Sequence, residues 1–579
     1  VLSFARNPHV RSRARSAKSS YDLLYADRIA EMTANYAQAR TWYPEPELAP
    51  TPASDDPHAI TDYVIITTSA IVAGSSKLQA FVDHKPARGF SVAVITEEQW
   101  GGGTGDAAAN NIRAYLQANY ITKGIRYVLL IGNPNPSTGD VPMKMLWPRY
   151  TSDTYREAPS DYFYADLTGN WDLNGNGYYG EETSDFGLGG IDRLADVTVG
   201  RIPFYGSFQD LDSILQKTIS YESGFPAGWM RNVLLSMKPS DSSTPGYHLG
   251  EAIKNDVVEP ALMNAVRVYE SDYGLNPSPE YTPCNYDNVL SAWQQHAGFH
   301  FWWTHGSETS ASDVFTSGRC QYLDNSYPTF TFQCSCLNAG PENSANLAYS
   351  LLKRGAIATD AATRVSWYYM GQTQFNLSDS NAGMTYHYAI RLLRDHLPFG
   401  DAHFAMMMDV PNEIWMNHCV FTLYGDPSVR YPMAPIISHT PLTDTDSNTQ
   451  PYIVSADVTA QAPLAADQPL LHWNTDGGPS FSAVPMAPAS GTTYSAGIPP
   501  QPYGTSVYYY IEASDIAGLR STYPGDAPAA LLSFQVAEDT SPPSITHTPL
   551  QDTADKFGPY IVEAIVTDNT GISDVSLYY

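Results

Sequence analysis

Between residues 62 and 434 short, continuously apolar segments alternate with amphipathic stretches, and this alternation restricts the fold more than any other feature. The strings D-Y-V-I-I-T-T, F-S-V-A-V-I-T and R-Y-V-L-L-I-G-N predict buried strands, and the stretches 78–88 and 111–120 predict helices. Strands that are apolar on both faces are typical of a parallel sheet with helices on both sides. We therefore expect an α/β fold.

The same alternation returns after a segment rich in Tyr, Asp and Gly. Strands are predicted from N-V-L-L-S-M at 232–237, V-R-V-Y-E-S, F-H-F-W-W-T at 299–304, T-F-T-F-Q-C-S-C and G-A-I-A-T-D, with helices near 249–265, 286–296 and 344–353. We expect two α/β subdomains in tandem, or two halves of one unit, over residues 61–230 and 231–434.

Helical periodicity ends at about Ala434, and prolines, threonines and alternating strands such as S-V-Y-Y-Y-I-E-A-S-D follow. H-T-P-L occurs at His439 and again at His547, and P-Y-I-V repeats with the same offset of 108 residues. This offset is close to the length of one immunoglobulin-like domain. We expect an immunoglobulin-like β-sandwich over 435–540 and a second, truncated copy over 541–579.

The chain has 579 residues, of which 60 are Asp or Glu and 32 are Lys or Arg, so its formal net charge is −28. A polyanion of this size repels phosphate backbones and anionic lipid, which argues against nucleic-acid binding. Five cysteines are too few for a disulfide scaffold, and their odd number leaves at least one thiol free. We expect residues 1–60 to be a remnant of a pro-segment followed by a proline-rich linker.

Export is predicted from composition, because 40 tyrosines, many Ser and Thr residues and few lysines are typical of secreted bacterial proteins. The chain has no apolar run of about 18 residues, so we expect no transmembrane segment. It begins with Val1 and no apolar signal core follows, so any export signal is expected to have been removed or to lie outside this chain. The predicted location is extracellular or at a prokaryotic cell surface, with association through the C-terminal modules.

Two successive predicted strands end in residues that can do chemistry. His305 follows the first in W-W-T-H-G-S-E-T, and Cys336 follows the second in F-T-F-Q-C-S-C-L-N. The carboxyl ends of adjacent parallel strands meet at one edge of a sheet, where open α/β sheets bind ligands, so we expect sulfur and imidazole to meet there. A thiol with an ordinary pKa of about 8.5 needs such a base to attack at neutral pH.

Gly306 and Cys334 belong to the same two motifs. Gly306 lacks a side chain, so its N–H can approach a substrate carbonyl and form an oxyanion hole with the N–H of Cys336. Cys334 is a competing nucleophile, but it lies one step back inside the strand and is assigned to the core. A lone buried cysteine or histidine is usually structural, whereas the two motifs on successive strands favour catalysis.

From about Tyr63 to about Arg430 the sequence resembles the gingipain-type cysteine peptidases, relatives of caspases and legumain. The shared motifs, in order, are Y-V-I-I-T with A-F-V-D-H-K-P-A-R-G, R-Y-V-L-L-I-G, A-D-V-T-V-G-R, T-H-G-S-E-T, C-S-C-L-N and L-Y-G-D-P-S. The resemblance implies a caspase-like parallel-sheet sandwich in two subdomains. It also implies a cysteine endopeptidase that hydrolyses protein or peptide substrates through an acyl-enzyme.

The resemblance further implies roles for individual residues. Cys336 is implied as the nucleophile, His305 as general base and acid, and Asp196 of A-D-V-T-V-G-R as the group that orients the histidine. Gingipains often have glutamate at that position, and Asp196 equally suits a residue that only caps a loop. Asp210 lies near the acidic substrate-pocket position of one gingipain type, but its helical pattern equally suits a surface charge. Trp367 is a second substrate-binding candidate, as core or pocket wall.

The string D-L-N-G-N-G-Y-Y-G-E-E at 172–182 has oxygen side chains at positions 1, 3 and 5 and glycine at position 6 of an EF-hand-type loop. Position 12 is threonine, so one of the two preceding glutamates would have to complete the coordination, and an Asn/Gly-rich turn can also form without an ion. We expect a structural Ca²⁺ that braces the loop before Asp196. The predicted ligands are Asp172, Asn174, Asn176, the carbonyl of Tyr178, Glu181 and Glu182.

The sequence thus predicts a secreted cysteine endopeptidase. The alternative is a non-catalytic, calcium-stabilised adhesion or binding protein of the cell surface on a peptidase-like scaffold, and intact His305 and Cys336 favour catalysis over it. An intracellular caspase-like regulator is disfavoured, because cytosolic calcium is too scarce to fill a weak site. Neither the cleavage specificity nor the activation step follows from the sequence.

Overall fold

The computed structural model describes residues 61–149, 155–223, 229–261, 263–432, 434–460, 463–515, 520–538, 540–568 and 572–579. The predicted pro-segment remnant and linker at 1–60 lie outside these residues. The chain divides into two compact units, Val1–Tyr431 and Pro432–Tyr579. This division lies three residues before the boundary expected at 434.

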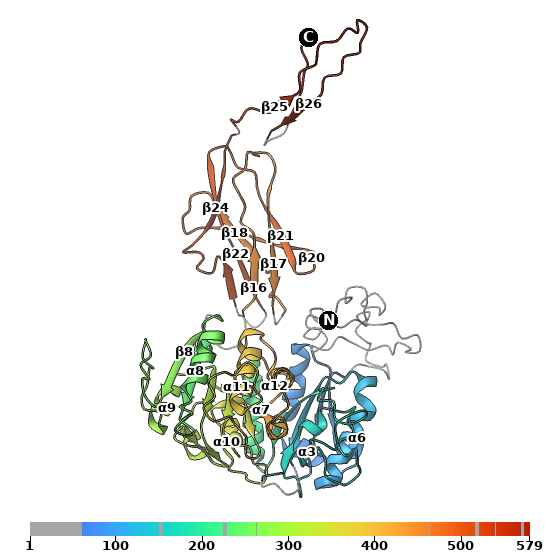
Figure 1. Ribbon diagram of the computed structural model, residues 1–579, viewed down its shortest axis with the longest axis vertical. Helices are drawn as coiled ribbons and strands as arrows, with labels where there is room; N and C mark the ends of the chain where they lie inside the picture. The colour runs from blue at the N-terminus through green and yellow to red at the C-terminus, as the bar shows by residue number, and fades with distance from the viewer. Residues whose placement is uncertain are drawn as a thin grey trace. The chain divides into compact units, whose positions relative to one another are not determined.

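One ten-stranded sheet runs through the first unit, so the two predicted α/β halves share a single sheet (Figure 1). In spatial order its strands are β2 (Val92–Ile95), β1 (Tyr63–Ile66), β3 (Tyr127–Gly132), β6 (Thr198–Pro203), β15 (Phe421–Tyr424), β14 (Ala356–Ala362), β13 (Thr329–Cys334), β9 (Phe299–Trp303), β7 (Asn232–Met237) and β8 (Asn264–Tyr269). The small antiparallel strands of this unit are β4 (Lys144–Leu146), β5 (Ala158–Ser160), β10 (Gly306–Ser307), β11 (Ser310–Ala311) and β12 (Phe315–Thr316).

The sheet is parallel within two groups of strands that run in opposite directions. β15 is parallel to β6, with Tyr424 opposite Arg201, but antiparallel to β14, with Tyr424 opposite Thr359. The strands from β14 to β8 therefore run against those from β2 to β15. As a result, the carboxyl ends of β9 and β13 lie at the same edge as the amino end of β6. We call this edge the Cys336 edge and the other the opposite edge.

Helices bury both faces of the sheet, as the continuously apolar strands predict. On β1 the residues Val64 and Ile66 belong to one apolar core, whereas Tyr63 and Ile65 belong to another. The first face is covered by α5 (Glu97–Trp100), α6 (Gly105–Lys123), α8 (Tyr247–Ile253), α11 (Asn381–Ala389), α12 (Phe399–Asp409) and α13 (Trp415–Val420). The second is covered by α3 (Ser69–Gly74), α4 (Leu78–His84), α7 (Phe208–Glu222), α9 (Tyr286–Trp293) and α10 (Leu347–Lys353).

Two helices end earlier than the periodicity of their apolar residues predicts. The helix expected over 78–88 is α-helical only to His84 and ends as a 3₁₀ turn at Arg88, where Gly89 adopts a φ of 89°. The helix expected over 249–265 ends as α-helix at Ile253 and continues as a π-helical turn to Val258. These differences affect where the following loops begin, and they do not change the apolar core.

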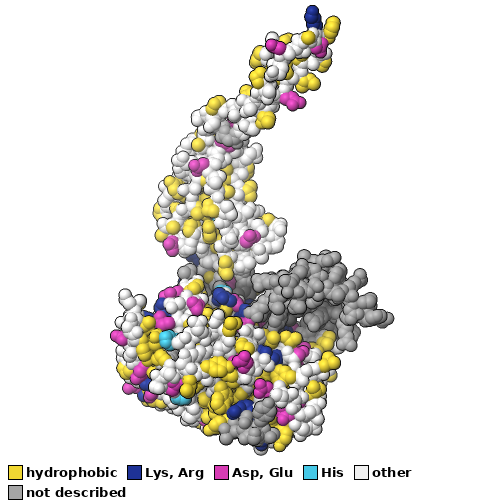
Figure 2. All heavy atoms as spheres, viewed as in Figure 1, with side chains coloured by type: hydrophobic (Ala, Val, Ile, Leu, Met, Phe, Trp, Pro, Cys, Tyr) yellow, Lys and Arg dark blue, Asp and Glu magenta, His cyan; other side chains and the backbone are white. Residues whose placement is uncertain are grey.

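Charged side chains are dispersed over the face of the molecule shown in Figure 2 and form no single patch there. Lys85, in the 3₁₀ turn that follows α4, is instead fully buried. Its Nζ donates to both oxygens of Glu222, at 2.9 and 2.8 Å, and contacts the carboxylate of Asp426. Tyr63 donates to the same Asp426 at 2.9 Å. The L-Y-G-D-P-S motif thus supplies one carboxylate of a buried ion cluster.

The second unit consists of two antiparallel sheets around one core. One sheet has β16 (Ile436–His439), β17 (Tyr452–Thr459), β21 (Thr493–Ile498) and β20 (Ala487–Ser490). The other has β19 (Ser482–Pro485), β18 (Leu470–Asn474), β22 (Thr505–Ser514), β23 (Arg520–Tyr523) and β24 (Leu532–Val536). Buried and exposed residues alternate along all of β17, as expected for a strand with one face on a core.

The repeated sequence motifs correspond to a repeated hairpin. β25 (Ser544–His547) pairs with β26 (Ala564–Thr567), and Ser544 lies opposite Thr567. In the first copy Ile436 lies opposite Thr459, each 108 positions before its counterpart. The register of the first β-hairpin is therefore reproduced in residues 541–579.

Candidate functional site

The motifs that contain His305 and Cys336 follow two neighbouring strands of the sheet. β9 pairs with β13 in parallel, and Trp303 lies opposite Cys334 at the ends of the two strands. His305 and Cys336 each follow two residues later, and the amide of Thr304 still donates to the carbonyl of Cys334 at 3.1 Å. Since adjacent strands lie about 4.8 Å apart, His305 and Cys336 leave neighbouring positions at one edge of the sheet.

Gly306 holds the two chain segments in close approach. A Cβ atom on this residue would lie 2.4 Å from the carbonyl oxygen and 2.8 Å from the amide nitrogen of Cys336. Both distances are too short for any side chain, so only glycine allows the backbone after His305 to pack on the backbone of Cys336. The N–H groups of Gly306 and Cys336 are thereby brought close together.

The orientation of His305 follows from its hydrogen bond. Its Nε2 lies 2.6 Å from the carbonyl oxygen of Ser240, in the loop after β7. A carbonyl oxygen can only accept, so Nε2 carries a proton and the neutral ring has Nδ1 as its basic nitrogen. The ring of Tyr368 packs edge-on against the imidazole with centroids 6.4 Å apart. His305 is thus fixed as the tautomer that presents a base at Nδ1.

Cys336 is half-buried, and its Sγ lies 3.6 Å from the carbonyl oxygen of Ser366, in the loop after β14. Burial raises the pKa of this thiol above its ordinary value, against the opposing effect of the Ser366 hydrogen bonds. The next residue, Leu337, has a φ of 67° and donates its amide to the carbonyl of Arg364 at 3.0 Å. The thiol at rest is therefore protonated and needs a base during attack.

An ionised carboxylate lies behind Tyr368. The phenol of Tyr368 donates to Asp241 at 3.0 Å, and Asp241 also accepts from the amide and hydroxyl of Ser243 and from the hydroxyl of Thr244. These hydrogen bonds, the one from the Ser243 hydroxyl above all, hold the pKa of Asp241 well below its usual range. Burial and the Asp241 carboxylate raise the pKa of Tyr368 to about 12, so the phenol remains a donor.

Asn338 fastens the two loops to each other. This fully buried side chain donates through Nδ2 to the carbonyls of Ser307, at 2.6 Å, and Ser310, at 3.1 Å. Ser335 contacts Asn338 Oδ1 and accepts from the indole of Trp302 at 3.0 Å. The backbone that follows Cys336 is thus tied to the backbone that follows His305.

Sequence reasoning assigned no catalytic or orienting role to Ser240, Asp241, Ser366, Tyr368 or Asn338. The first four lie in the loops after β7 and β14, the strands that flank β9 and β13 in the sheet. The strand-end rule that selected His305 and Cys336 applies to these strands equally and could have pointed to those loops. Asn338 lies two residues after the cysteine, within the C-S-C-L-N motif itself.

The structure does not bring Asp196 to His305. Asp196 precedes β6, and three strands separate β6 from β9, so the two residues lie about 19 Å apart along the edge. Its carboxylate accepts from the amides of Leu167 and Thr168, at 2.8 and 3.0 Å. The orienting role implied by resemblance is therefore wrong, and Asp196 caps a turn.

Asp210 also lies away from Cys336. It occupies the first turn of α7, which follows the carboxyl end of β6 and so begins at the opposite edge of the sheet. Its nearest ion-pair partner is Lys353, at 3.9 Å, at the end of α10. Asp210 is a surface charge and not a wall of a substrate pocket at the Cys336 edge.

Trp367 lies between Ser366 and Tyr368, which contact Cys336 and His305 respectively. Its backbone is held by the amide side chain of Asn417, which accepts from the Trp367 amide at 2.8 Å and donates to the Trp367 carbonyl at 2.9 Å. The guanidinium of Arg149 lies 4.7 Å from the centre of the indole ring. Trp367 is thus close to Cys336, and its role toward substrate stays a prediction.

The predicted calcium loop is closed by its own hydrogen bonds. The amides of Asn174 and Asn176 donate to one oxygen of Glu181, at 3.0 and 2.6 Å, and Asp172 accepts from the amide of Gly177. The side chains of Asp172, Asn174, Asn176 and Glu181 are thus linked within one turn. Glu182 is not among them, because it faces Arg149 and Asp379, and burial raises its pKa. Within the described residues, no three His, Cys, Asp or Glu side chains are grouped to hold a metal ion.

All five cysteines are unpaired, and four of them are buried. Burial raises the pKa of Cys334, which is fully enclosed in the core below the sheet edge. The described cysteines thus include one partly exposed thiol, Cys336, and it lies where the sequence predicts chemistry.

Comparison with known proteins identifies the family. The sequence model of peptidase family C25 matches residues 56–432, more than half of the chain. The crystal structure of the Arg-specific cysteine proteinase gingipain R (RgpB) aligns with a TM-score of 0.51 and 16% identity, over 84% of this chain and 99% of that chain. A complex of Porphyromonas gingivalis RgpB pro- and mature domains gives a TM-score of 0.49 and 15% identity, over 82% and 99%. No curated protein matches the sequence. The chain belongs to peptidase family C25, the gingipain family of cysteine peptidases.

Proposed function

We propose that this cysteine peptidase is a secreted endopeptidase in which Cys336 is the nucleophile and His305 the general base and acid. The observation that carries the proposal is the pairing of β9 with β13, which puts both residues at one sheet edge. The tautomer imposed by Ser240 supports it, since the base at Nδ1 is left for the thiol.

The proposed reaction starts from a protonated thiol, because burial raises the pKa of Cys336. As Sγ attacks the scissile carbonyl, its proton moves to Nδ1 of His305, and the carbonyl of Ser240 stabilises the imidazolium through Nε2–H. The N–H groups of Gly306 and Cys336 stabilise the oxyanion. His305 then protonates the leaving amine and later takes a proton from the water that hydrolyses the thioester.

A direct test uses two cysteine variants and a denatured protein substrate. Cys336→Ala is expected to lose at least about 10⁴-fold in kcat/KM, because no nucleophile remains. Cys334→Ala serves as the matched control and should retain activity, since Cys334 is a core residue. Equal, measurable activity of wild type and Cys336→Ala would contradict Cys336 as the nucleophile, whereas no hydrolysis by wild type would support the non-catalytic adhesion protein that the second unit also suits.

We also propose that the loop at 172–182 binds a structural Ca²⁺ through Asp172, Asn174, Asn176, Glu181 and the carbonyl of Tyr178. The gathering of these groups supports this, because an amide rotated by half a turn presents oxygen in place of nitrogen. Chelation with EGTA should then lower the melting temperature of wild type but not of Asn176→Ala. An unchanged melting temperature in wild type would contradict the site.

The second unit is proposed to be immunoglobulin-like and to act at the cell surface. The two antiparallel sheets around one core and the repeat of 108 residues support this assignment. Among the described helices, none has the length and apolar character needed to cross a bilayer. Immunolabelling of intact cells against this unit tests the location, and labelling only after lysis would contradict it.

A further inference from the structure

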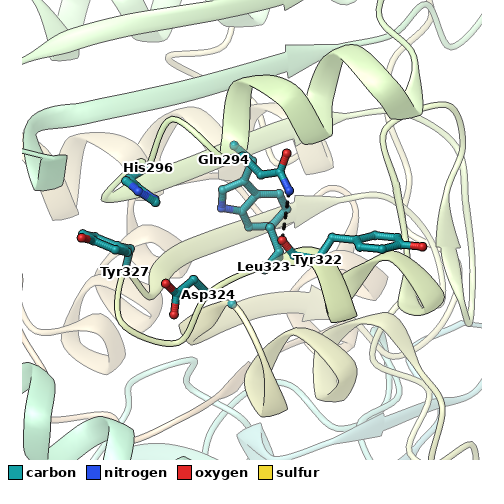
Figure 3. A pocket seen from close by; sticks show the side chains of 8 residues that line it. Gln294, His296, Tyr322, Leu323, Asp324 and Tyr327 are labelled. Carbon is teal, nitrogen blue, oxygen red and sulfur yellow. Dashed lines mark hydrogen bonds between the residues drawn. The ribbon is translucent and has the colours of Figure 1, made fainter.

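The opposite edge of the sheet carries a cavity of about 250 Å³ that the proposed peptidase reaction does not use (Figure 3). Its walls come from the segments that lead into three adjacent strands, β9, β13 and β14. The carboxyl ends of β9 and β13 carry the catalytic pair, whereas the cavity lies at the amino ends of the same strands. A ligand bound here would not touch Cys336.

One wall of the cavity is held rigid by aromatic packing. The ring of Tyr327 stacks on the imidazole of His296, with centroids 3.7 Å apart and planes 13° from parallel. Trp229 packs edge-on against the same tyrosine at 5.5 Å. His296 itself has a φ of 67°, which L side chains rarely adopt, and its carbonyl accepts from Asn232 at 3.0 Å. The Tyr327 ring is therefore preorganised and not free to rotate into the cavity.

The floor of the cavity depends on Gly355. A Cβ atom there would lie 2.4 Å from Leu323, so glycine lets the segment before β13 pack directly on the start of β14. Asn325 accepts from the Gly355 amide at 2.9 Å, and Arg354 donates to the Leu323 carbonyl at 2.9 Å. These bonds keep the two segments in place beside the cavity.

The lining contains one carboxylate, that of Asp324. Its Oδ1 accepts from the amide of Ser326 at 2.8 Å, and within the described residues Oδ2 has no partner. The amide nitrogen of Gln294 is engaged by the Tyr322 carbonyl at 3.2 Å. The second carboxylate oxygen of Asp324 thus lies beside aromatic rings, and Figure 3 shows Asp324, Tyr327 and His296 around the same space.

We propose that this cavity binds a ligand with an alkylammonium group, the cation at Asp324 and the alkyl part against Tyr327 and Trp293. Aromatic faces and a carboxylate attract a cation together, and the net charge of −28 favours it further. An anion would be repelled by the Asp324 carboxylate. A free amine and a lysine side chain share this chemistry.

The test is a ligand-observed NMR titration of the full chain after Cys336 has been alkylated with iodoacetamide, so that the catalytic cleft is blocked. The probes are butylammonium and Nα-acetyl-lysine amide, with butanol as the neutral control. Saturable binding of at least one amine is expected, and the probe with the higher affinity tells a free amine from a lysine side chain. Asp324→Asn should weaken that binding roughly three- to tenfold, and Tyr327→Ala by a similar factor.

Two matched variants separate the cavity from general effects of charge and structure. Asp287→Asn removes an exposed carboxylate from α9 and should leave the affinity unchanged, as should Tyr327→Phe, which keeps the ring. Absence of saturable binding by both amines would overturn the proposal. Equal affinity in wild type and Asp324→Asn, or butanol binding as tightly as butylammonium, would overturn it as well.

Discussion

The buried cluster around Lys85 and the pair at the Cys336 edge use the same sheet in opposite ways. Lys85 is enclosed by two carboxylates, and each of them accepts further hydrogen bonds from neighbouring groups. His305 and Cys336 instead contact the backbone carbonyls of Ser240 and Ser366. Within the described residues neither of them forms an ion pair.

The difference shows that paired charges contribute to the stability of the fold, whereas polar groups without an ion pair can take part in proton transfer. Charges that satisfy each other in the interior cannot change protonation without a large loss of stability, so such a cluster fixes the fold. A neutral thiol beside a neutral imidazole can transfer a proton at little cost, which is what nucleophilic attack requires. We therefore expect substitutions in the first region to affect stability and those in the second to affect rate.

The largest effect is expected from Lys85→Met, which leaves Glu222 and Asp426 as buried, uncompensated carboxylates. The free energy of unfolding of the first unit should fall by about 3–5 kcal/mol, measured by denaturant titration. Lys77→Met, at the N-cap of α4, should change it by less than about 0.5 kcal/mol, because no described ion pair involves that residue. Equal losses in both variants would break the comparison.

A smaller effect, on rate, is expected from Asn338→Ala. Without this amide the carbonyls of Ser307 and Ser310 lose their donor, and the backbone beside Gly306 shifts relative to Cys336. We expect kcat to fall about 10- to 100-fold with little change in KM. Asn343→Ala, which removes an exposed bond to Glu308, is the control. A change confined to KM would argue that Asn338 contacts substrate instead.

A third effect, on the pH dependence of stability, is expected from Asp166, a buried carboxyl group for which the described residues supply no ion pair. Burial raises its pKa to about 7, with Asp192 and Asp196 adding to the shift. The folded state then holds a proton that the unfolded state releases near pH 4, so stability should decline as pH rises from about 4 to about 7. Asp166→Asn should abolish this decline when melting is followed in chelator.

A second variant sharpens the pH experiment. Asp192→Asn removes an exposed neighbouring charge, so the pKa of Asp166 should fall and the decline should end at a lower pH. If the melting curves of wild type and Asp166→Asn run parallel from pH 4 to pH 8, the carboxyl group of Asp166 does not titrate in this range.

Sequence periodicity predicted the sheet and its two-sided helical cover, because burial on both faces leaves a continuous apolar string. It could not predict that β15 separates strands of opposite direction, since an apolar string has no polarity. That reversal matters, because it places the start of β6 and the ends of β9 and β13 at one edge. Strand direction is a property of the connections between elements, not of the strands.

The sequence could predict those site residues that directly follow the carboxyl ends of adjacent parallel strands. His305 and Cys336 were found this way, whereas Asp196 and Asp210 were assigned by resemblance, which carries no distance across the sheet. Four strand spacings separate Asp196 from His305, and no motif records that number. Ser240 could not be predicted from its side chain, because it contacts His305 through its backbone carbonyl, a group that every residue possesses.

The central claim, attack by the sulfur of Cys336, is tested most directly by trapping the acyl-enzyme. A single turnover of a peptide ester would be quenched with acid, and the acylated peptide would be located by mass spectrometry. The account predicts the acyl group on Cys336 in wild type and a strongly reduced yield in His305→Ala. An acyl group on Cys334, or full acylation without His305, would contradict it.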